Sequence, residues 1–388
     1  MAKLGEICAF QSGGTPSKNK PEYFGGEIPW ISTTALNGGE INEADAVAWI
    51  TPKAIRESAA KIVPANSIMV GTRVGIGKIA INTVEMSTSQ DVISLIDIDE
   101  DKWYKPYLCK LLLSKKDYFN SQARGATIKG IKIDVVANID VPEIDYATQR
   151  KIAETLSKVN ELIAFRDQQL AKLDELVKAR FVEMFGDVLL NSMEWPEKTL
   201  ESIADVVSGI TKGRKTTETD LQEVPYMAVS NVKDGYIDWT TVKTILATRR
   251  EIEQYRLMPD DILMTEGGDP DKVGRGAIIK VPLKNSIHQN HIFRVRLNEQ
   301  EISPSFFAEY LQHQKAKRYF LGCAKQTTGI ASINMRQLKA LPTLVPPLSL
   351  QNQFAAFVER VNQQKQTVQQ SLEKLELMKK ALMQEYFG

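Results

Sequence analysis

Apolar residues recur at steps of four and three along two long stretches of this chain, and neither stretch contains a glycine or a proline. In the first stretch, from Thr148 to Phe185, the apolar positions are Ile152, Leu156, Val159, Ile163, Leu170, Leu173 and Val177. In the second they are Phe354, Val358, Val361, Val368, Leu372, Leu375 and Leu382. This spacing predicts two long helices, each with one narrow apolar seam, which is the pattern of a coiled coil. Arg166 and Lys365 are the polar interruptions of the two seams.

The two stretches end alike because the chain repeats itself. Leu170-Ala-Lys-Leu173 recurs as Leu372-Glu-Lys-Leu375, and the final Phe387-Gly388 repeats Phe185-Gly186 at a constant offset of 388 − 186 = 202 residues. A period of this length is a whole domain followed by a long helix, far beyond the ~20–50 residues of solenoid repeats. The protein is therefore expected to consist of two copies of one unit.

The two copies predict a fold of the α+β class. Their globular parts contain short β-rich runs punctuated by glycine and proline, with a few helical stretches. Only about 14 residues separate the first helix from the second globular part, so a second helix packed beside the first must run antiparallel to it. We expect two domains related by pseudo-two-fold symmetry and separated by two antiparallel helices that form a coiled coil. The expected boundaries are 1–145 for the first domain, 146–187 for the first helix, 188–198 for a linker, 199–345 for the second domain and 346–388 for the second helix.

Composition narrows the class of protein. The 388 residues are 43% apolar and 25% charged, which is ordinary for a globular protein with two cores. Lys and Arg number 49 against 48 Asp and Glu, so any nucleic-acid surface must be a local patch. The cysteines Cys8, Cys109 and Cys323 lie at unrelated positions of the two copies, which argues against disulfides and a cysteine metal site. No apolar run is long enough to span a membrane and the start lacks a secretory signal, so we expect a cytoplasmic protein without membrane contact.

The sequence carries no catalytic signature. A DNA adenine methyltransferase would need an Asn/Asp-Pro-Pro-aromatic loop, and the neighbours of Pro346-Pro347 do not fit that pattern. The segment 71–78 is superficially like a phosphate loop, but Thr72 stands where such a loop needs glycine. His288 and His291 form a closely spaced pair, for which a role in supporting a loop is favoured over a metal site. We predict neither catalytic residues nor bound metal.

Candidate chemistry lies instead in loops rich in Lys, Arg, Gln, Asn, Thr and Gly, at matching places in both copies. Arg and Lys bind phosphates or guanine edges, Gln and Asn pair with adenine, and glycine lets backbone amides approach a phosphate. The pattern favours duplex DNA as the ligand, while a solvated turn is the alternative for any single loop. In the first copy the candidate DNA-binding residues are Thr15, Ser17, Lys18, Lys20, Arg73, Lys78, Gln90, Thr127 and Lys129. In the second copy they are Thr211, Lys212, Arg214, Lys215, Lys272, Arg275, Gln289, Asn290, Lys325, Gln326 and Thr327.

Several motifs resemble those of the specificity subunit of type I restriction-modification systems. In the second copy they are Thr265-Glu-Gly-Gly-Asp269, Gly274-Arg-Gly276, His288-Gln-Asn-His291 and Thr327-Thr-Gly-Ile-Ala-Ser-Ile-Asn334. In the first copy they are Ser12-Gly-Gly-Thr-Pro-Ser17, Pro21-Glu-Tyr-Phe-Gly-Gly26 and Gly125-Ala-Thr-Ile-Lys-Gly130. Each copy then closes with a glutamine before an apolar helix, Gln149 in the first and Gln351 in the second. The likeness spans nearly the whole chain.

This resemblance implies two target recognition domains, each of which reads one half-site of an asymmetric, bipartite duplex DNA target. It also implies a scaffold for two methyltransferase (M) subunits, which restriction/translocase (R) subunits can join. The chain itself would be non-catalytic, with S-adenosylmethionine and ATP bound by the partner subunits. Each helix is expected to be roughly 57 Å long, which exceeds one duplex turn of ~34 Å, so an unread gap should separate the half-sites.

Two other classes of protein stay open at this point. One is a coiled-coil adaptor that joins proteins without reading DNA, and the other is a stand-alone DNA-modifying enzyme with an unrecognised active site. The adaptor would show no salt-dependent DNA binding even with its partners present. The enzyme would methylate or cleave DNA as the pure chain.

Overall fold

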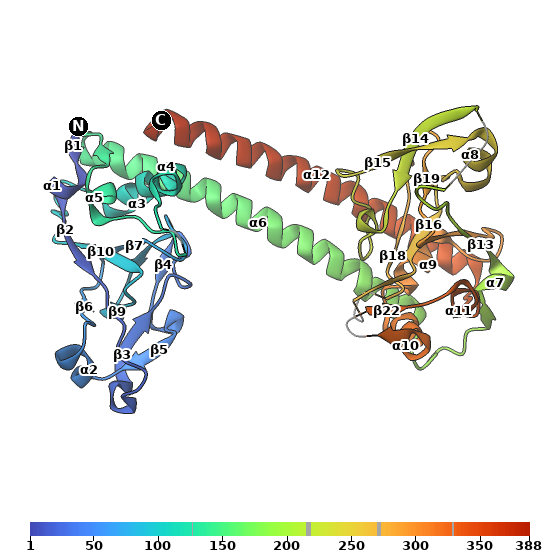
Figure 1. Cartoon of the computed structure of the whole chain (residues 1–388), viewed down its shortest axis with the longest axis horizontal. Coiled ribbons are helices and arrows are strands. Elements are labelled where there is room, and N and C mark those ends of the chain that lie inside the picture. The colour runs from blue at the N-terminus through green and yellow to red at the C-terminus, as the bar shows by residue number, and fades with distance from the viewer. Residues whose placement is uncertain (126, 215–218, 270–272, 328–329) are drawn as a thin grey trace. The chain divides into compact units, whose positions relative to one another are not determined.

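The computed structural model of the protein describes residues 1–125, 127–214, 219–269, 273–327 and 330–388. Residue contacts divide the chain into two compact units. Unit 1 comprises Met1–Arg166 and Ser371–Gly388, and unit 2 comprises Asp167–Gln370. Each unit therefore contains one globular domain together with one end of each long helix (Figure 1).

Unit 1 is built on two sheets and a two-stranded ladder. The strands of its first sheet are, in spatial order, β2 (Ala9–Ser12), β10 (Val92–Ile96), β7 (Ile68–Gly71), β8 (Ile79–Asn82) and β4 (Glu40–Ile41). Those of its second sheet are β5 (Ala48–Ile50), β3 (Phe24–Ile31), β9 (Met86–Thr88) and β6 (Ile62–Val63). The ladder pairs β1 (Ala2–Lys3) with β11 (Asp140–Val141). Its short helices are α1 (Leu4–Ile7), α2 (Pro52–Glu57), α3 (Lys105–Ser114), α4 (Lys116–Gln122) and α5 (Ile133–Ala137).

Unit 2 contains three sheets and a similar ladder. The strands of its first sheet are β13 (Ala204–Ser208), β20 (Ile292–Leu297), β16 (Ile262–Thr265) and β18 (Gly276–Ile278). The other two sheets are formed by β15 (Lys243–Thr248), β14 (Leu221–Met227) and β19 (Ile287–His288), and by β17 (Gly267–Gly268), β22 (Ile330–Ser332) and β21 (Lys325–Thr327). The ladder pairs β12 (Glu197–Thr199) with β23 (Pro342–Leu344). Its short helices are α7 (Leu200–Ile203), α8 (Arg249–Tyr255), α9 (Pro304–Tyr310), α10 (Gln314–Cys323) and α11 (Met335–Lys339).

The strand pairing of unit 2 repeats that of unit 1. The order β13–β20–β16–β18 matches β2–β10–β7–β8, and every neighbouring pair in both sets is antiparallel. β14 pairs in parallel with β19, as β3 does with β9. A shared strand order with a shared pairing sense confirms the prediction of two repeated α+β domains.

A strand that is buried on both faces lies at the centre of each unit. In β7, Ile68 and Val70 belong to the core that α3 covers, while Met69 between them belongs to the core shared with the second sheet. In β16, Met264 and Leu263 divide in the same way between two cores. Successive side chains of a strand point to opposite faces, so a strand covered on both sides must be apolar at consecutive positions. This explains why β7 and β16 contain apolar residues at consecutive positions.

The two long helices are α6 (Tyr146–Phe185) and α12 (Leu348–Phe387), each of 40 residues. The side chain of Asp145 accepts hydrogen bonds from the backbone and hydroxyl of Thr148, which caps the start of α6, and these bonds lower the pKa of that carboxyl. Gly186, with φ of +71°, ends the helix in the left-handed conformation that glycine adopts readily. Within the described part of the chain, no helix is both long and apolar enough to cross a membrane.

In unit 1 the first half of α6 packs against the domain core and the last turns of α12. The core contains Leu156 of α6 and Phe387 of α12, and the Phe387 ring lies 5.4 Å from that of Tyr107. The polar interruption of this seam is satisfied, because Arg166 Nε donates to Ser371 Oγ at 3.2 Å. Among the other seam positions of unit 1, Val159 and Leu372 are buried, and Ile152, Ile163 and Leu375 are partly buried.

In unit 2 the second half of α6 runs antiparallel to the first half of α12. The rings of Phe181 and Phe354 lie 5.4 Å apart, and further from the domain the ammonium of Lys365 pairs with the carboxylate of Asp174. A small apolar cluster lies on both sides of the Lys365–Asp174 pair, and its members include Leu173 and the α12 residues Val361 and Val368. Of the remaining seam residues, Leu170 and Val358 are partly buried.

A buried glutamine attaches the start of α6 to its own domain. The side-chain carbonyl of Gln149 accepts the backbone N–H of Tyr104 at 2.9 Å. Its amide donates to the carbonyl oxygens of Lys102 and Ile144, both at 3.0 Å. Gln149 is only 1% exposed, so these hydrogen bonds replace water for the groups that it contacts.

The glutamine at the matching position of α12 makes the same set of hydrogen bonds. Gln351 accepts the backbone N–H of Ser303 at 2.8 Å and donates to the carbonyl oxygens of Glu301 at 3.2 Å and Pro346 at 2.7 Å. The two glutamines are 202 residues apart, which is the repeat offset. The sequence pattern of a glutamine ahead of an apolar helix thus has a structural cause in both units.

We expect Gln149→Ala and Gln351→Ala each to lower the free energy of unfolding by about 2–4 kcal/mol, because three backbone groups lose a buried partner. Urea denaturation followed by circular dichroism measures this change. Gln168→Ala, at an exposed position of α6, is the matched control and should stay within about 0.5 kcal/mol of the wild type. Equal stability of all three variants would contradict the attachment role.

Candidate nucleic-acid interface

Four loops of unit 1 meet at one end of the first sheet. Gly71 at the end of β7 pairs with Val92 at the start of β10, and Ser12 at the end of β2 pairs with the next residue of β10. The loops that leave these strand ends are therefore neighbours, although they are far apart in sequence. We call residues 12–15, 72–78, 89–91, 124–125 and 127–130 the unit 1 loop cluster.

Backbone hydrogen bonds hold this cluster together. The N–H of Thr72 donates to the carbonyl of Asp91 at 2.8 Å, and the carbonyl of Thr72 accepts the N–H of Ile131 at 2.8 Å. Arg124 and Gly130 pair in the antiparallel sense through two hydrogen bonds, both of 2.9 Å, and we call the described residues 124–125 and 127–130 the hairpin. Because the bonds use backbone atoms alone, they leave the side chains of the cluster available for a ligand.

Unit 2 brings together the corresponding loops through corresponding bonds. The N–H of Glu266 donates to the carbonyl of His291 at 3.0 Å, and the carbonyl of Glu266 accepts the N–H of Ile333 at 2.8 Å. Asn290 N–H donates to the carbonyl of Ile210 at 3.0 Å. We call residues 208–214, 266–269, 273–275, 288–291, 325–327 and 330–332 the unit 2 loop cluster.

One glycine in each cluster is required by close approach. A Cβ atom at Gly13 would lie 2.2 Å from the carbonyl oxygen of Ser89, and one at Gly209 would lie 1.9 Å from that of His288. In unit 1 any larger residue would push the loop after β2 away from the loop before β10. In unit 2 it would push the loop after β13 away from the loop before β20. The glycine-rich loops noted in the sequence therefore serve to bring two loops of each cluster into contact.

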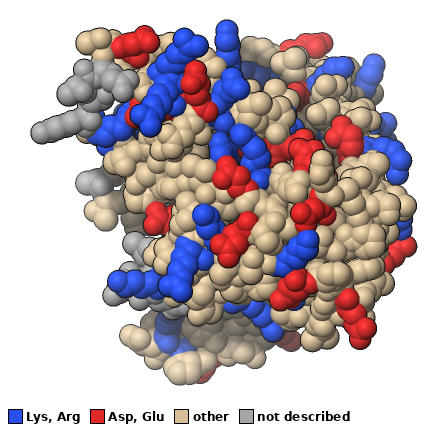
Figure 2. Space-filling view, turned by 90° about the vertical axis from the view of Figure 1, so that its right-hand side faces the viewer, with Lys and Arg blue, Asp and Glu red and all other residues tan. Residues whose placement is uncertain are grey.

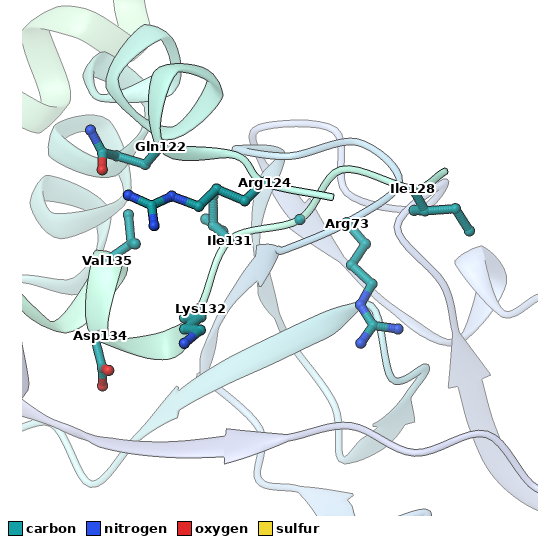
Figure 3. A pocket seen from close by; sticks show the side chains of 9 residues that line it. Arg73, Gln122, Arg124, Ile128, Ile131, Lys132, Asp134 and Val135 are labelled. Atoms are coloured by element: carbon teal, nitrogen blue, oxygen red, sulfur yellow. The ribbon is translucent and has the colours of Figure 1, made fainter. Parts of the chain in front are cut away.

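The side chains of the unit 1 cluster form a basic cleft of about 540 Å³ (Figure 3). Positive charge comes from Arg73, Arg124 and Lys132, whereas Asp134 is the acidic residue of the lining. The Arg73 side chain is 54% exposed and lies 3.7 Å from Asp91, a distance at which the ion pair is weak. The guanidinium groups of Arg73 and Arg124 point to different sides of the hairpin (Figure 3). This geometry suits a phosphate-bearing strand that passes along the cleft.

The side chains of the unit 2 cluster are chemically different. His291 Nδ1 lies 2.6 Å from a carboxylate oxygen of Glu266, and His291 Nε2 lies 3.3 Å from the side-chain amide of Asn290. The matching backbone bonds put Glu266 at the position of Thr72 and His291 at the position of Asp91. On the face of unit 2 shown in Figure 2, Lys and Arg side chains gather toward the left edge of the view among acidic neighbours. Unit 2 thus offers both hydrogen-bond donors and acceptors.

The predicted DNA-binding residues fall into several groups. Those exposed on the loop clusters are Thr15, Arg73, Lys78, Gln90, Thr127, Lys129, Thr211, Lys212 and Lys325. Arg275, Gln289 and Asn290 are on the unit 2 cluster and half-buried. Ser17, Lys18 and Lys20 are exposed beyond the unit 1 cluster, and the Lys20 ammonium donates to the Tyr23 hydroxyl at 2.8 Å. Lys215 and Lys272 lie outside the described residues, and of Gln326 and Thr327 only the backbone in β21 is described.

Arg214 has a partner within the protein. Its guanidinium forms a two-pronged ion pair with Glu251 at the start of α8 and donates to the carbonyl of Leu246 at 3.1 Å. The Glu251 carboxylate raises the pKa of Arg214, and Arg214 lowers that of Glu251. A DNA contact by Arg214 would require this pair to open, so its evident role is to hold the loop onto α8.

Three polar residues of the clusters and the cleft are not among the residues that the sequence predicts. Arg124 and Lys132 lie just outside the Gly125-Ala-Thr-Ile-Lys-Gly130 motif, on either side of it. Glu266 is acidic, and a search for basic and amide side chains does not select it. The only signal for Glu266 was its position within the Thr265-Glu-Gly-Gly-Asp269 motif, while nothing in the sequence indicated that Lys132 lines the same cleft as Arg73.

Exposed apolar side chains lie on the long helices away from their seams. In α6 they include Leu162, Phe165, Leu176 and Val182, and in α12 they include Leu377 and Met378. Leu176 and Met378 stand 202 residues apart, at the same position of the repeat. The repeat therefore exposes apolar surface at one equivalent position of each long helix.

Comparison with known proteins places the chain in a family. The family described as type I restriction modification DNA specificity domain matches residues 1–175 and 193–377. The two matched segments coincide with the two copies found in the sequence and cover most of the chain. This protein belongs to the family of type I restriction-modification DNA specificity domains.

Several specificity subunits are similar to the chain in sequence. That of the type I restriction enzyme EcoKI from Escherichia coli K12 is 22% identical over 354 residues, which cover 86% of this chain and 75% of that protein. That of MjaIX from Methanocaldococcus jannaschii is 27% identical over 253 residues, which cover 61% of this chain and 58% of that protein. A second relative from M. jannaschii is 28% identical over 196 residues, or 50% of this chain, and is matched over 45% of its length. The chain thus spans about half the length of these M. jannaschii relatives.

Solved structures share the fold. The S subunit of a type I restriction-modification system from M. genitalium has a TM-score of 0.58 with 17% identity, and the match covers 100% of this chain and 95% of that one. A chain from a structural study of complex assembly and conformational transition of the type I R-M system has a TM-score of 0.60 with 16% identity, covering 100% and 96%. At this level of identity, the likeness establishes the architecture alone.

His288 is a buried member of the unit 2 cluster. Its ring is 0% exposed, and Nδ1 donates to the carbonyl of Ile292 at 3.0 Å. Burial away from water lowers the pKa of His288 to about 4. The imidazole ring is therefore neutral in the folded protein. The backbone carbonyl of His288 accepts the N–H of Ile210 within the cluster.

We expect the free energy of unfolding to fall by about 3 kcal/mol as the pH drops from 6.5 to 4, through His288 alone. In this window the unfolded chain binds a proton on His288 while the folded chain does not, so acid favours unfolding. Urea titrations at several pH values measure the slope for the wild type and for His288→Gln, which removes the titrating group. Identical slopes for the two proteins would contradict the assignment.

Proposed function

We propose that this protein is the DNA sequence-specificity subunit of a type I restriction-modification complex. Each unit binds one half-site of a bipartite duplex target through its loop cluster. One observation carries the proposal. In both units the same backbone hydrogen bonds join the loops at one end of the first sheet, but the side chains on these loops differ. Family membership supports the same function.

Because the loops of the two units share their backbone bonds but differ in their side chains, we expect the two half-sites of the DNA target to differ in sequence. The Thr72 bonds of unit 1 and the Glu266 bonds of unit 2 connect the same three loops. Each cluster contains two arginines, but Thr72 of unit 1 is matched by Glu266 in unit 2, and Asp91 is matched by His291. Base edges in the major groove present distinct donor and acceptor patterns, so two different side-chain sets select two different half-sites.

Local charge supports binding to the phosphate backbone. The whole chain has a net charge of only +1, yet three of the four charged residues that line the unit 1 cleft are basic. Cations on the rim of a cleft neutralise phosphates and release counterions, a contribution that is independent of sequence. Phosphate contacts of this kind position the loops over the bases.

The long helices support a scaffold for two methyltransferase subunits. In unit 2 a groove of about 580 Å³ lies between the helices, with Leu176 and Phe357 among its lining. In unit 1 a groove of about 640 Å³ lies beside the last turns of α12, with Ile163 and Phe387 among its lining. Each groove combines apolar side chains with charged ones, a mixture that suits an amphipathic partner helix. We infer that catalysis, S-adenosylmethionine and ATP belong to the partner subunits.

The length of the helices supports a gap between the half-sites. Each has 40 residues, which corresponds to about 60 Å at ~1.5 Å per residue. One turn of duplex DNA is ~34 Å, so helices of this length suit half-sites separated by bases that neither cluster reads.

We expect Arg73→Ala and Arg124→Ala each to weaken binding on every duplex sequence and to lower the slope of log K against log salt by about 1, because each removes one phosphate contact. Fluorescence anisotropy of the complete complex over a range of salt concentrations measures both quantities. Arg56→Ala, an exposed arginine on α2 of the same unit, is the matched control. Unchanged slopes in both cluster variants would favour a scaffold that does not bind DNA through unit 1.

We expect Leu176→Asp and Met378→Asp each to weaken binding of a methyltransferase subunit about tenfold, because a carboxylate would be buried at an apolar contact. Surface plasmon resonance with the immobilised partner measures the affinity. Val47→Asp, equally exposed but located on the loop that enters β5, should bind as the wild type does. Loss of binding in the control alone would place the partner on the domain instead of the helices.

A further inference from the structure

The hairpin of the unit 1 loop cluster carries an apolar residue near its tip. Ile128 is 62% exposed, whereas residues 127 and 129 on either side of it are the polar Thr127 and Lys129. Figure 3 shows the Ile128 side chain directed outward at the end of the hairpin opposite to Arg124. A single exposed isoleucine is common on protein surfaces, so its setting decides what it means.

Contacts at the base of the hairpin hold Ile128 in its exposed position. Two backbone hydrogen bonds between Arg124 and Gly130 close the hairpin at its base. Gly125 has φ of +137°, and a Cβ there would lie 2.2 Å from the carbonyl oxygen of Ile128, so the chain turns back on itself at this point. Gly130 packs against the stem of Arg73, since a Cβ at Gly130 would lie 3.0 Å from Arg73 Cγ. A hairpin fixed at its base presents its tip without folding it back into the core.

Basic residues line the same cleft as this apolar tip. Arg73, Arg124 and Lys132 line the same cleft as Ile128, and Lys129 follows it in the hairpin. Val74, in the neighbouring loop of the cluster, is a second exposed apolar residue with 58% of its surface accessible. A protein partner that covered only apolar surface would leave these cations unmatched. A polyanion that carries apolar groups between its charges matches both features.

Duplex DNA is such a polyanion, and its major groove contains one kind of apolar group, the 5-methyl of thymine. Isoleucine has no hydrogen-bonding atoms in its side chain, so it gains nothing from the polar edges of the other bases. The cations of the cleft would meet the phosphates beside the groove. The arrangement therefore combines positioning by charge with selection by an apolar contact.

We propose that Ile128 is a specificity-determining residue that contacts the 5-methyl group of a thymine in the half-site bound by unit 1. This inference rests on the proposed function, because it requires the loop cluster to lie on DNA. It goes beyond that function in naming the residue, the base and the atom that it recognises.

Deoxyuridine tests the contact, because it differs from thymidine only in lacking the 5-methyl group. The target of the complete complex is first mapped from the methylated adenines in DNA of cells that carry the chain with its partner. Each thymine of the target duplex is then replaced in turn, and the dissociation constants of the complex are compared. At one position the replacement should weaken binding about fourfold, the effect of removing one buried methylene-sized group.

Variants of Ile128 assign that position to this residue. Ile128→Ala should abolish the difference between thymine and uracil at that position and leave it unchanged elsewhere, while Ile128→Val, which keeps a methyl surface, should retain it. Val47→Ala, with a similarly exposed residue outside the cluster, should behave as the wild type. Circular dichroism should show the same fold for all variants, because the two residues are exposed.

The outcomes separate this inference from the proposed function. A target bound equally well with thymine or uracil at every position overturns the methyl contact, while sequence-specific binding by the complex upholds the proposed function. Ile128→Ala that weakens all duplexes alike, with the thymine preference intact, also overturns the contact. A complex that binds no duplex in a salt-dependent way overturns both.

Discussion

The pairing of α6 with α12 is the constraint on which each unit depends. A narrow apolar seam on a long helix is exposed to water unless another helix covers it. In unit 2 that requirement brings Leu173 to Val361 and Val368, and in unit 1 it places Phe387 in the core beside Tyr107. Neither domain core is complete without residues from both helices. Folding of a recognition domain and formation of the helix pair are therefore coupled, and the buried glutamines Gln149 and Gln351 attach that pair to each domain.

In the loop clusters, main-chain atoms set the positions of the loops, and the side chains differ between the two units. Backbone bonds at Thr72 and Glu266, together with the contacts at Gly13 and Gly209, set the positions of the loops mainly through main-chain atoms. The hydroxyls of Thr72 and Ser208 each add one bond to a carbonyl of a neighbouring loop. Side chains are then free to differ between the two units at little cost to the frame. A protein that reads DNA gains from this division, because new half-sites can arise by substitution on the loops. The differences between the basic cleft of unit 1 and the carboxylate, histidine and amide groups of unit 2 are of this kind.

Much of the architecture was predictable because it follows from periodicity. The steps of four and three gave the helices, and the 202-residue offset gave the repeated unit, since both features are written in consecutive residues. The candidate site was harder to predict. Lysine and arginine in matching loops indicated DNA, but the sequence did not separate Arg214, which pairs with Glu251, from Arg73, which is exposed. It also gave no sign that Lys132 lines the same cleft as Arg73.

The sequence by itself determined the α+β repeat, the two apolar seams and the family, because short-range patterns and motifs encode them. Only the tertiary structure decided which loop residues share a surface. Strand pairing brings Gly71 beside Val92 and Ser12 beside Ile93, and this pairing places loops from distant parts of the chain at one end of a sheet. Pairing between distant strands depends on the packing of the whole domain, so it leaves no local pattern in the residues that it brings together.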